Sequence, residues 1–498
     1  MEPTYLPDLA EFERKCAEGN VVPVYRQLIA DALTPVSAFQ KIADGPYAFL
    51  LESAAGPEKI GRYCFLGSGP FAILSSTGSK VQVRRGDSVQ EVECDNPLEA
   101  LRSQLKAFRL AHVKGLPRFS CGAVGFMGYD VVRFVERLPE CPPDDRGIPD
   151  IVFMFFDEIL IFDHHNHTIK VVCGARTDGT TPERAYEEAR RRIDAMIAKL
   201  RTPVANLSDD ITPMGEISLP YTSNIEKADY LAGVERCKEY IKAGDIFQVV
   251  PSQRLEAATS AEPLDIYRAL RVINPSPYMF LLKMGALSMV GSSPEVMVRV
   301  ENRKVTVRPI AGTRWRGESE EEDERLAAEL LADPKERAEH VMLVDLGRND
   351  VGRVCRYGTV KVDELMVIER YSHVMHIVSE VVGELRDGLD ALDALMACLP
   401  AGTLTGAPKV RAMEIIDEFE TTKRGPYGGA VGYFDFSGNM DTCITIRTVV
   451  LQGEKAYVQA GGGIVADSVP EREHEESLNK ARALLRAIQV AEQMGGQR

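Results

Sequence analysis

Short hydrophobic segments separated by turn residues dominate the first 200 positions of the chain. Several have the length and the β-branched or aromatic content of strands, namely Ala48–Leu51, Tyr63–Leu66, Phe71–Ser75 and Lys80–Arg84. Two further strand candidates, Ile151–Asp163 and Thr168–Val172, flank the sequence HHNH. We interpret HHNH as a polar hairpin turn, because nothing nearby completes a histidine metal site. This pattern predicts antiparallel pairing.

A helical pattern at Thr181–Leu200 is followed by a polar, proline-containing stretch with the composition of a linker. The sequence therefore predicts two domains, residues 1–215 and residues 216–498, or one very large interwoven unit. Further helices are expected at Ile225–Ala243, Glu320–Leu331, from Asp333 onward, Leu389–Ala397 and Val410–Glu418, and strands at Ser288–Val300, Lys304–Ile310, Cys443–Leu451 and Ala456–Gln459. Because strands and helices do not alternate regularly, the pattern favours the α+β class with large antiparallel β-sheets.

Composition narrows the class of protein. The 498 residues carry a net charge of −15 and no basic block, which argues against nucleic acid or an anionic membrane as the main partner. Ten cysteines are scattered without a CxxC pair, as in proteins of a reducing compartment. The first residues lack the pattern of a signal peptide, and no apolar segment approaches the ~20 residues that cross a bilayer. We expect a soluble cytoplasmic protein.

The stretch with the most distinctive chemistry covers residues 460–485. Its three glycines, 461–463, permit a backbone with φ > 0 that brings N–H groups close to an anion. Ser468 and Glu471 then have the spacing of a capping box, so that a helix is expected to follow. A strand, a glycine turn and a helix start therefore form a candidate site for an acidic ligand.

Two groups of carboxylates lie on predicted helices. Glu473, Glu476 and Lys480 follow each other at i, i+3 and i+7 and share one stripe, a pattern that suits a divalent cation beside an acidic substrate. The alternative is an acidic first turn that only complements the helix dipole. Glu336 and Glu339 share one face of another helix, and Glu339 is a second candidate carboxylate.

Arg447 is the most distinctive candidate cation. It is expected within a strand that places Ile444 and Ile446 on one face and the guanidinium on the other. A buried guanidinium needs an anion, which is either a ligand or the partner in a structural salt bridge. The pattern leaves both alternatives open.

Nine segments occur in an order that resembles one known family: GDIFQVVPSQ (244–253), GSSPE (291–295), PIAGTR (309–314), EHVMLVDLGRND (339–350), YSHVMH (371–376), AGTLTGAPK (401–409), PYGGAVGYF (426–434), TCITIRT (442–448) and QAGGGIV (459–465). This family is that of the chorismate-utilising enzymes, and the segments are most similar to those of its anthranilate-forming members. In the first half, LLES (50–53) and GRYCFLG (61–67) resemble the family's tryptophan-inhibitor segment. The resemblance implies large antiparallel β-sheets packed as a sandwich, with helices on the outside.

The resemblance also implies a reaction, in which chorismate and ammonia give anthranilate and pyruvate in tryptophan biosynthesis, with Mg²⁺ as cofactor. A glutamine amidotransferase subunit, component II, would supply the ammonia within a heterotetramer, and tryptophan would inhibit. Water-using members place a lysine at the position of Gln248, and aminodeoxychorismate synthases commonly have one at the position of Ala311. Both residues therefore favour anthranilate. The alternatives are an aminodeoxychorismate synthase component I and a non-catalytic tryptophan-binding regulatory subunit.

The resemblance assigns roles to individual residues. Glu295 would protonate the departing hydroxyl, which requires a raised pKa, and His376, expected on an apolar helix face, would act in the elimination. Thr313 is the third implied catalytic residue and would contact the substrate. The implied substrate contacts are Gly312, Thr403, Tyr427, Arg447, Gly461, Gly463 and Lys480. The implied Mg²⁺ ligands are Glu339 and Glu476, with Glu336 and Glu473 acting through water. The implied inhibitor site consists of Leu51, Glu52, Ser53, Pro277, Tyr278 and Met279.

Overall fold

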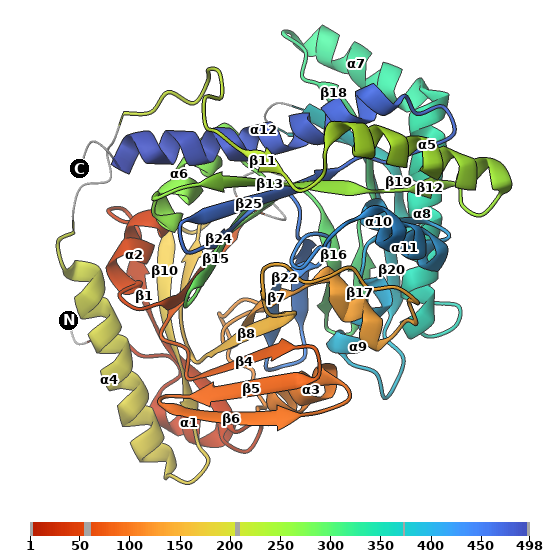
Figure 1. The fold of residues 1–498 in the computed structure, drawn as a ribbon. Coiled ribbons are helices and arrows are strands. Elements are labelled where there is room, and N and C mark those ends of the chain that lie inside the picture. The colour runs from red at the N-terminus through yellow and green to blue at the C-terminus, as the bar shows by residue number, and fades with distance from the viewer. Residues whose placement is uncertain (1–2, 54–60, 205–209, 372–373, 496–498) are drawn as a thin grey trace.

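Two large sheets form the centre of the molecule (Figure 1). The computed structural model describes residues 3–53, 61–204, 210–371 and 374–495. The first sheet has eleven strands in the order β1 (Val21–Ile29), β10 (Thr168–Arg176), β9 (Glu158–Asp163), β3 (Tyr63–Ser68), β2 (Tyr47–Glu52), β14 (Tyr278–Met284), β15 (Leu287–Ser293), β24 (Thr448–Gln452), β25 (Lys455–Gly461), β13 (Ser252–Ala258) and β11 (Thr222–Ser223). The pairings between these strands are antiparallel.

The second sheet has twelve strands. Their order is β18 (Ile310–Trp315), β20 (Val374–Glu384), β17 (Lys304–Val307), β16 (Val296–Glu301), β23 (Met440–Ile444), β22 (Ala430–Asp435), β7 (Gly122–Met127), β8 (Ile151–Phe156), β4 (Ala72–Thr77), β5 (Lys80–Arg85) and β6 (Ser88–Glu93), while β19 (Lys361–Arg370) pairs with β20. A short ribbon of β12 (Gln248–Val249) and β21 (Gly406–Ala407) forms a separate two-stranded sheet.

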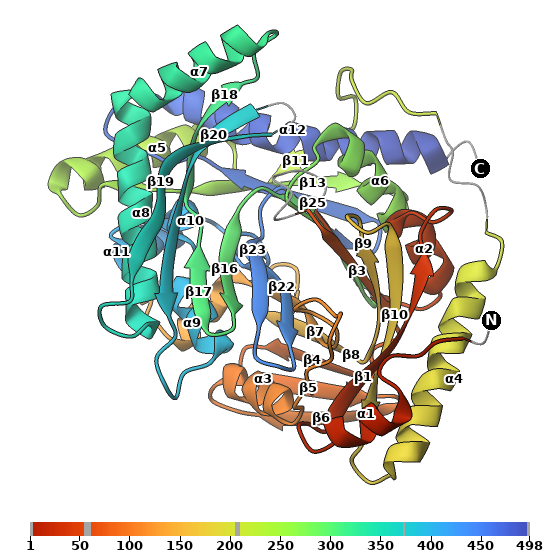
Figure 2. The same cartoon turned by 180° about the vertical axis from the view of Figure 1, so that it is seen from behind.

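Helices cover the outer faces of the sheets. They are α1 (Leu9–Lys15), α2 (Pro35–Ile42), α3 (Pro97–Lys106), α4 (Pro182–Arg201), α5 (Lys227–Ala243), α6 (Pro263–Ile273), α7 (Glu320–Ala332), α8 (Pro334–Val354), α9 (Ala391–Cys398), α10 (Gly402–Thr405), α11 (Lys409–Phe419) and α12 (Pro470–Gly495), with a 3₁₀ helix at Tyr129–Phe134. The helix α12 packs on α5, α6 and β25 (Figure 1), and α4 runs along β1 and β10 (Figure 2). Within the described ranges, no helix is both long and apolar enough to span a membrane.

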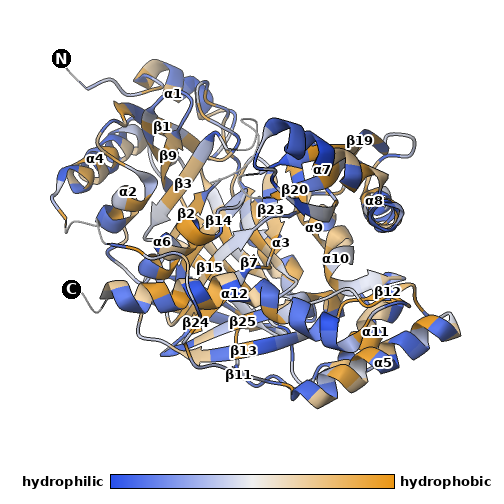
Figure 3. Ribbon diagram, turned by 90° about the horizontal axis from the view of Figure 1, so that it is seen from above, coloured by the Kyte–Doolittle hydropathy of each residue, from blue (hydrophilic) through white to orange (hydrophobic). Residues whose placement is uncertain are grey.

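The inner faces of the two sheets share one core. The ring centroids of Phe49 in β2 and Phe156 in β8 are 4.7 Å apart, and Phe119 stacks on Tyr433 of β22 at 4.1 Å. Hydrophobic residues concentrate in these strands, whereas α7 on the periphery is strongly hydrophilic (Figure 3). The α+β class and the sandwich of antiparallel sheets are therefore confirmed.

Both sheets continue across the boundary expected at residues 215 and 216. In the first sheet, β2 from the first part pairs with β14 from the second. In the second sheet, β7 pairs with β22. The main apolar cluster likewise contains residues of both parts. The two parts are thus interwoven, and the expected linker joins α4 to β11 without separating two cores.

Several expected strands are interrupted where the backbone must turn. The segment expected as one strand at Ile151–Asp163 forms β8 and β9, which belong to different sheets. The one expected at Ser288–Val300 breaks at residues 294–295 into β15 and β16, again in different sheets. The HHNH segment connects β9 to β10 as a hairpin turn, as expected. These breaks let one chain alternate between the two sheets.

Candidate active site

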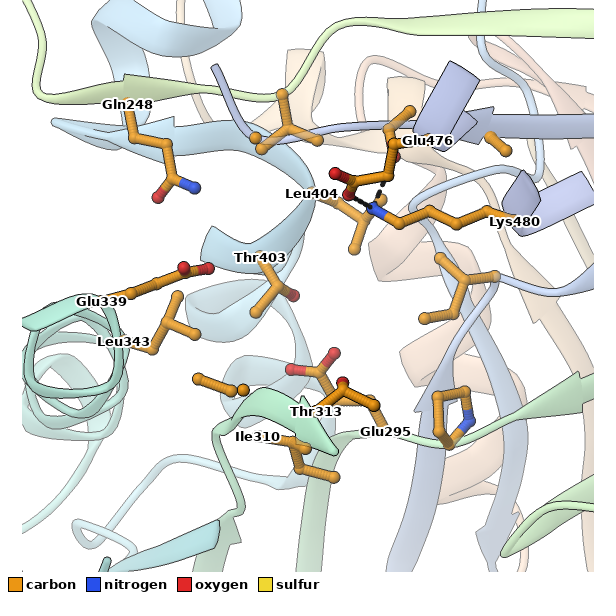
Figure 4. Close-up of a pocket in the computed structure, with 18 of the residues that line it drawn as sticks. Gln248, Glu295, Ile310, Thr313, Glu339, Leu343, Thr403, Leu404, Glu476 and Lys480 are labelled. Carbon is orange, nitrogen blue, oxygen red and sulfur yellow. Dashed lines mark hydrogen bonds and ion pairs between the residues drawn. The ribbon is translucent and has the colours of Figure 1, made fainter. Parts of the chain in front are cut away.

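One cavity of about 540 Å³, here called the large cavity, brings together residues from segments far apart in the sequence. It lies among α8, α12, β18, β20 and the β12–β21 ribbon (Figure 4). The predicted catalytic, substrate and metal residues that line it are Glu295, Gly312, Thr313, Glu336, Glu339, His376, Thr403, Tyr427, Arg447, Gly461, Gly463, Glu473, Glu476 and Lys480. Gln248 and Ala311 line it as well. The structure therefore places the whole predicted set around one space.

Glu295 lies in the break between β15 and β16, which places its side chain at the floor of the large cavity (Figure 4). Its carbonyl accepts the backbone N–H of Ile444 at 3.0 Å, which fixes this turn against β23. Burial raises the pKa of the Glu295 carboxyl to about 8, and the nearby Thr403 hydroxyl partly opposes this increase. A carboxyl group with this pKa holds its proton at neutral pH and can act as a general acid.

Arg447 does not lie within a strand, which corrects the expectation. The strand β23 ends at Ile444 and β24 begins at Thr448, and Arg447 between them adopts a left-handed backbone with φ 51°. Its Nη1 donates to the carbonyl of Lys480 at 2.9 Å, and burial lowers the pKa of the guanidinium. No carboxylate in the described part of the chain forms an ion pair with it. A buried cation without a counterion is suited to an anionic ligand.

Arg424, which the sequence analysis did not single out, holds the wall behind Tyr427. It is 2% exposed and donates to the Leu404 and Val250 carbonyls at 2.7 and 2.6 Å. Its remaining donors bind Glu420, and its guanidinium lies 5.5 Å from the centre of the Tyr427 ring. Three segments that line the large cavity are thus tied to one buried ion pair. A charged residue beside glycine and proline in KRGPYGG is the signal that could have identified it.

The four glutamates extend into the large cavity from two helices, Glu336 and Glu339 from α8 and Glu473 and Glu476 from α12. Burial raises the pKa of Glu339, and the charges of Glu336 and Glu476 add to the increase. Burial likewise raises the pKa of Glu473, with a contribution from Glu476. These carboxylates therefore repel one another across the cavity.

The present arrangement of the glutamates is open. Glu339 and Glu476 lie on different sides of the cavity (Figure 4), and Glu476 binds the Lys480 ammonium at 2.8 Å. Within the described residues, no three of the four bring carboxylate oxygens within 4.8 Å of one another. The donor set, carboxylate oxygens that repel each other, fits a hard divalent cation that retains several waters.

His376 lies on β20, not on a helix as expected. Its Nδ1 lies 2.8 Å from the carbonyl oxygen of Gly312 and 3.2 Å from the Thr313 hydroxyl. Because a carbonyl only accepts, Nδ1 carries the proton and Nε2 of the neutral ring has a free lone pair. Burial lowers the pKa of the imidazole, which keeps it neutral near pH 7. The ring is therefore held as a base.

Close packing, not a positive φ, explains the glycines at 461 and 463, which corrects the expectation for this stretch. None of them is among the described residues with a left-handed backbone. A Cβ at Gly461 would lie 2.2 Å from the carbonyl oxygen of Pro251, and one at Gly463 would lie 2.3 Å from the Gln248 amide nitrogen. The expected helix follows Ser468, since α12 begins at Pro470, and the Ser468 hydroxyl accepts the N–H of Val465 at 3.0 Å.

A second cavity, here called the small cavity, has a volume of about 70 Å³ and lies between the sheets. All residues of the expected inhibitor site line it, namely Leu51, Glu52, Ser53, Pro277, Tyr278 and Met279. Asp441 on its wall accepts hydrogen bonds from Arg118 at 2.7 Å, Arg299 at 3.0 Å and the Tyr278 hydroxyl at 2.9 Å. The Glu52 carboxylate is bound by Arg271 at 2.7 and 2.8 Å.

The fold is a sandwich of antiparallel sheets, and its large cavity combines an unpaired arginine, a carboxyl with a raised pKa and four acidic side chains. This combination is typical of an enzyme that acts on an anionic small molecule. The chain belongs to the family of chorismate binding enzymes, whose model matches residues 46–486. It is 53% identical to anthranilate synthase component 1 of Acetivibrio thermocellus, over 98% of this chain and 99% of that protein.

Solved structures agree. The crystal structure of anthranilate synthase component I from Streptococcus pneumoniae TIGR4 matches with a TM-score of 0.77 and 37% identity, over 92% of this chain and 99% of that chain. The menaquinone-specific isochorismate synthase MenF from Escherichia coli matches with a TM-score of 0.69 and 17% identity, over 96% of this chain and 98% of that chain. This second likeness concerns the fold alone.

Proposed function

We propose that the chain converts chorismate and ammonia into anthranilate and pyruvate, as the names of its relatives suggest. The observation that carries the proposal is the pairing, in one cavity, of an unpaired Arg447 with a Glu295 whose pKa is about 8. The first suits a dicarboxylate, and the second suits departure of a hydroxyl group. Gln248 stands where the water-using members of the family have a lysine, so the expected nucleophile is ammonia.

Binding begins with the two carboxylates of chorismate. The Arg447 guanidinium and the Tyr427 hydroxyl are proposed to hold the enolpyruvyl carboxylate, with N–H groups of Gly461 and Gly463 nearby. Burial raises the pKa of Tyr427 to about 12, so its hydroxyl remains a hydrogen-bond donor. Arg424 keeps this wall in place because it is bonded to both Val250 and Leu404.

We propose two proton transfers. As ammonia forms the new C–N bond, the C–O bond to the ring hydroxyl breaks, and Glu295 donates its proton so that water leaves. The newly bound ammonium group releases one proton to solvent. In the second step the ring C–H loses its proton while the bond to the enolpyruvyl oxygen breaks, and the departing enolate takes up a proton on carbon, which yields the aromatic amine and pyruvate. The free Nε2 of His376 is the proposed acceptor of that proton, with Nδ1 fixed by Gly312.

The glutamates would hold Mg²⁺, with Glu339 and Glu476 as direct ligands and Glu336 and Glu473 acting through water. The bound cation would supply positive charge for the ring carboxylate. Within the chain, Lys480 already binds Glu476 and the Gly461 carbonyl, at 2.8 and 2.9 Å. Lys480 therefore positions one ligand of the proposed metal site and one substrate-binding backbone group.

Ammonia is proposed to come from a separate glutamine amidotransferase subunit. Such a subunit would need a nucleophilic cysteine, whose family signature resembles GxCxG, and none of the ten cysteines of the sequence lies in that pattern. Ammonium has no lone pair and cannot attack the ring. Added ammonium salt therefore supports a faster reaction as the pH rises, because a larger fraction of it is present as ammonia. A partner that releases ammonia next to the cavity removes this dependence.

Tryptophan is the proposed inhibitor, bound in the small cavity. The volume of the small cavity, about 70 Å³, is well below the roughly 300–1,000 Å³ of ligand pockets. Binding of tryptophan would therefore require β2, β14 and the adjoining segments to shift. Tyr278 pairs in the sheet with Ser293, two residues before Glu295. A shift at the small cavity is therefore transmitted directly to the catalytic acid, and a coupling of about 1–3 kcal/mol suffices for regulation.

The deciding experiment is product identification. Purified chain is incubated with chorismate, ammonium and Mg²⁺, and the product is separated and identified by mass spectrometry. We expect anthranilate and pyruvate in equal amounts, and none from glutamine alone. An aminodeoxychorismate or isochorismate product would contradict the proposed reaction, and efficient turnover of glutamine by the pure chain would contradict the proposed partner.

A further inference from the structure

Three donor atoms of different chemistry converge at Glu52, one of the residues that line the small cavity. In the first sheet, Leu51 of β2 lies opposite Phe65 of β3, so Glu52 lies beside Cys64. His164 follows β9, which pairs with β3 on its other side. A carboxylate oxygen of Glu52, Sγ of Cys64 and a ring nitrogen of His164 all lie within 4.8 Å of one another. The Sγ and Nε2 atoms are 2.9 Å apart.

The surroundings of these atoms resemble the support of a metal site. The Glu52 carboxylate is oriented by hydrogen bonds from the Tyr267 hydroxyl at 2.7 Å and from Arg271. Outer hydrogen bonds of this kind fix the direction of a metal-binding carboxylate. The backbone N–H of His164 donates to the Arg62 carbonyl at 3.0 Å, so the chain is fixed at this position. The sheet thus holds two of the donors rigidly.

A metal ion can reach the cluster from the side of His164. Cys64 is fully buried, Glu52 is 6% exposed and His164 is exposed. A hydrogen bond between thiol and imidazole accounts for the 2.9 Å contact, and Tyr267 and Arg271 hold the carboxylate beside this pair. Ligand atoms around one zinc ion lie roughly 3–4 Å apart, given bond lengths of about 2.0–2.3 Å. The three donor atoms, all within 4.8 Å of one another, lie close to that spacing.

We propose that Glu52, Cys64 and His164 form a site for a thiophilic divalent cation such as Zn²⁺, with water as a fourth ligand. Sulfur, imidazole and carboxylate are the donors that zinc takes in proteins, and three protein ligands with one water form an open site. On binding, the Cys64 S–H bond breaks, a sulfur–metal bond forms and the proton passes to solvent. No other step is involved.

The site is independent of the proposed catalysis but touches the proposed inhibition. Glu52 lines the small cavity and is the residue expected to bind the amino group of tryptophan. A cation bound to its carboxylate competes for that negative charge. This part of the inference rests on the proposed function, and we expect Zn²⁺ to raise the tryptophan concentration for half inhibition several-fold.

Cobalt provides the direct test, because a thiolate bound to Co²⁺ gives an intense near-ultraviolet charge-transfer band that carboxylate-bound Co²⁺ in the large cavity lacks. The full chain is titrated with Co²⁺ under reducing conditions. We expect the band to saturate at one equivalent, to disappear in Cys64→Ser and His164→Gln, and to be displaced by Zn²⁺. Cys173→Ser, in another buried strand of the same sheet, and His165→Gln, in the same turn, are the matched controls and should keep it.

The outcomes are separable. Absence of the band in the unmodified chain, or a band that survives His164→Gln, would overturn the site. His164 is exposed, so its substitution leaves the fold intact and the test remains valid even if Cys64→Ser does not fold. A normal band without any effect of Zn²⁺ on tryptophan inhibition would leave the metal site standing. That result would contradict only its link to the inhibitor.

Discussion

In the large cavity, Arg447 and Glu295 form no ion pair with any described residue, whereas in the small cavity every charged side chain on the wall has a partner. The large cavity also has the greater volume, about 540 Å³, against about 70 Å³ for the small cavity. The unpaired charge of the Arg447 guanidinium destabilises the fold until an anionic ligand pairs with it, whereas Glu295 avoids such a charge by keeping its proton. A paired network stabilises the closed cavity and must be moved apart before anything can enter.

This difference separates a site prepared for its ligand from a site that must be opened. In the first, electrostatic groups are fixed before the ligand arrives, which is how active sites stabilise developing charge. In the second, the proposed inhibitor would use part of its free energy of binding to shift β2 and β14, and that shift would regulate the active site under the proposed function. The predictions below test each side of the comparison.

The largest effect is expected at the proposed metal ligands. Glu339→Gln and Glu476→Gln should each abolish Mg²⁺-dependent anthranilate formation, because each removes a negative oxygen from a site with few protein ligands. Glu475→Gln, an exposed neighbour on α12, is the control and should retain full activity. The measurement is initial rate against Mg²⁺ concentration. Near-normal turnover in both ligand variants would contradict the metal assignment.

Glu295→Gln should lower kcat by about 10²–10⁴-fold, the usual contribution of a general acid. In the unmodified chain this acid acts only while protonated, so its contribution falls as the pH rises through about 8. Steady-state rates at a fixed concentration of free ammonia, measured from pH 6 to 9, separate this decrease from the effect of pH on the amount of ammonia. A rate that keeps rising above pH 8 would contradict the role of Glu295.

The same substitution should raise stability in alkali. The folded pKa of Glu295 is raised above the unfolded value, so the folded state keeps a proton that the unfolded state releases between about pH 4.5 and 8. Its favourable contribution is complete below that window and is lost as the pH rises through it. We expect Glu295→Gln to be about 1–3 kcal/mol more stable than the unmodified chain at pH 8. Denaturant unfolding at pH 5 and pH 8 measures this difference.

Arg447→Gln should weaken transition-state binding by about 2–3 kcal/mol, or roughly 30–150-fold in kcat/KM, because one carboxylate of the substrate loses a charge-assisted partner. Most of this loss should appear in KM for chorismate. Arg482→Gln, exposed on α12, serves as the comparison. An unchanged KM for chorismate would show that Arg447 has only a structural role.

The smallest effect on catalysis is expected at the small cavity. Ser53→Phe should fill it and remove tryptophan inhibition, a loss of about 5–150-fold in tryptophan sensitivity, while activity with ammonium stays within about two-fold. Ser88→Phe on the exposed strand β6 is the control. The assay is half-inhibitory tryptophan concentration. If Ser53→Phe is inhibited at the unchanged concentration, the inhibitor binds elsewhere.

Sequence reasoning located the residues of both cavities better than it located their backbone. The stripe of Glu473, Glu476 and Lys480 follows from helical spacing alone, and all three line the large cavity. Glu295 and Arg447 were expected within or beside continuous strands, yet both lie in breaks between strands. Strand propensity is local, whereas the break is imposed by the other sheet, which a single segment cannot signal.

Local sequence patterns also did not identify the buried residues that hold the walls of the large cavity in place. Arg424 lies in a loop and acts through carbonyls of Val250 and Leu404, contacts that only the tertiary structure defines. The glycines at 461 and 463 were recognised as necessary, but the reason, contact with Pro251 and Gln248, depends on a strand 200 residues earlier. Residue identity is thus predictable where the side chain itself does the chemistry, and less so where it fills space.

The pairing of early with late strands also determines the order in which the molecule can be completed on the ribosome. The strand β7 ends at Met127, but its neighbour β22 begins only at Ala430. At about 5–20 residues per second, the edge of β7 therefore waits roughly 15–60 s for its partner during synthesis. An unpaired edge is open to other nascent chains for that time. The second sheet can therefore be completed only when nearly all of the chain has emerged.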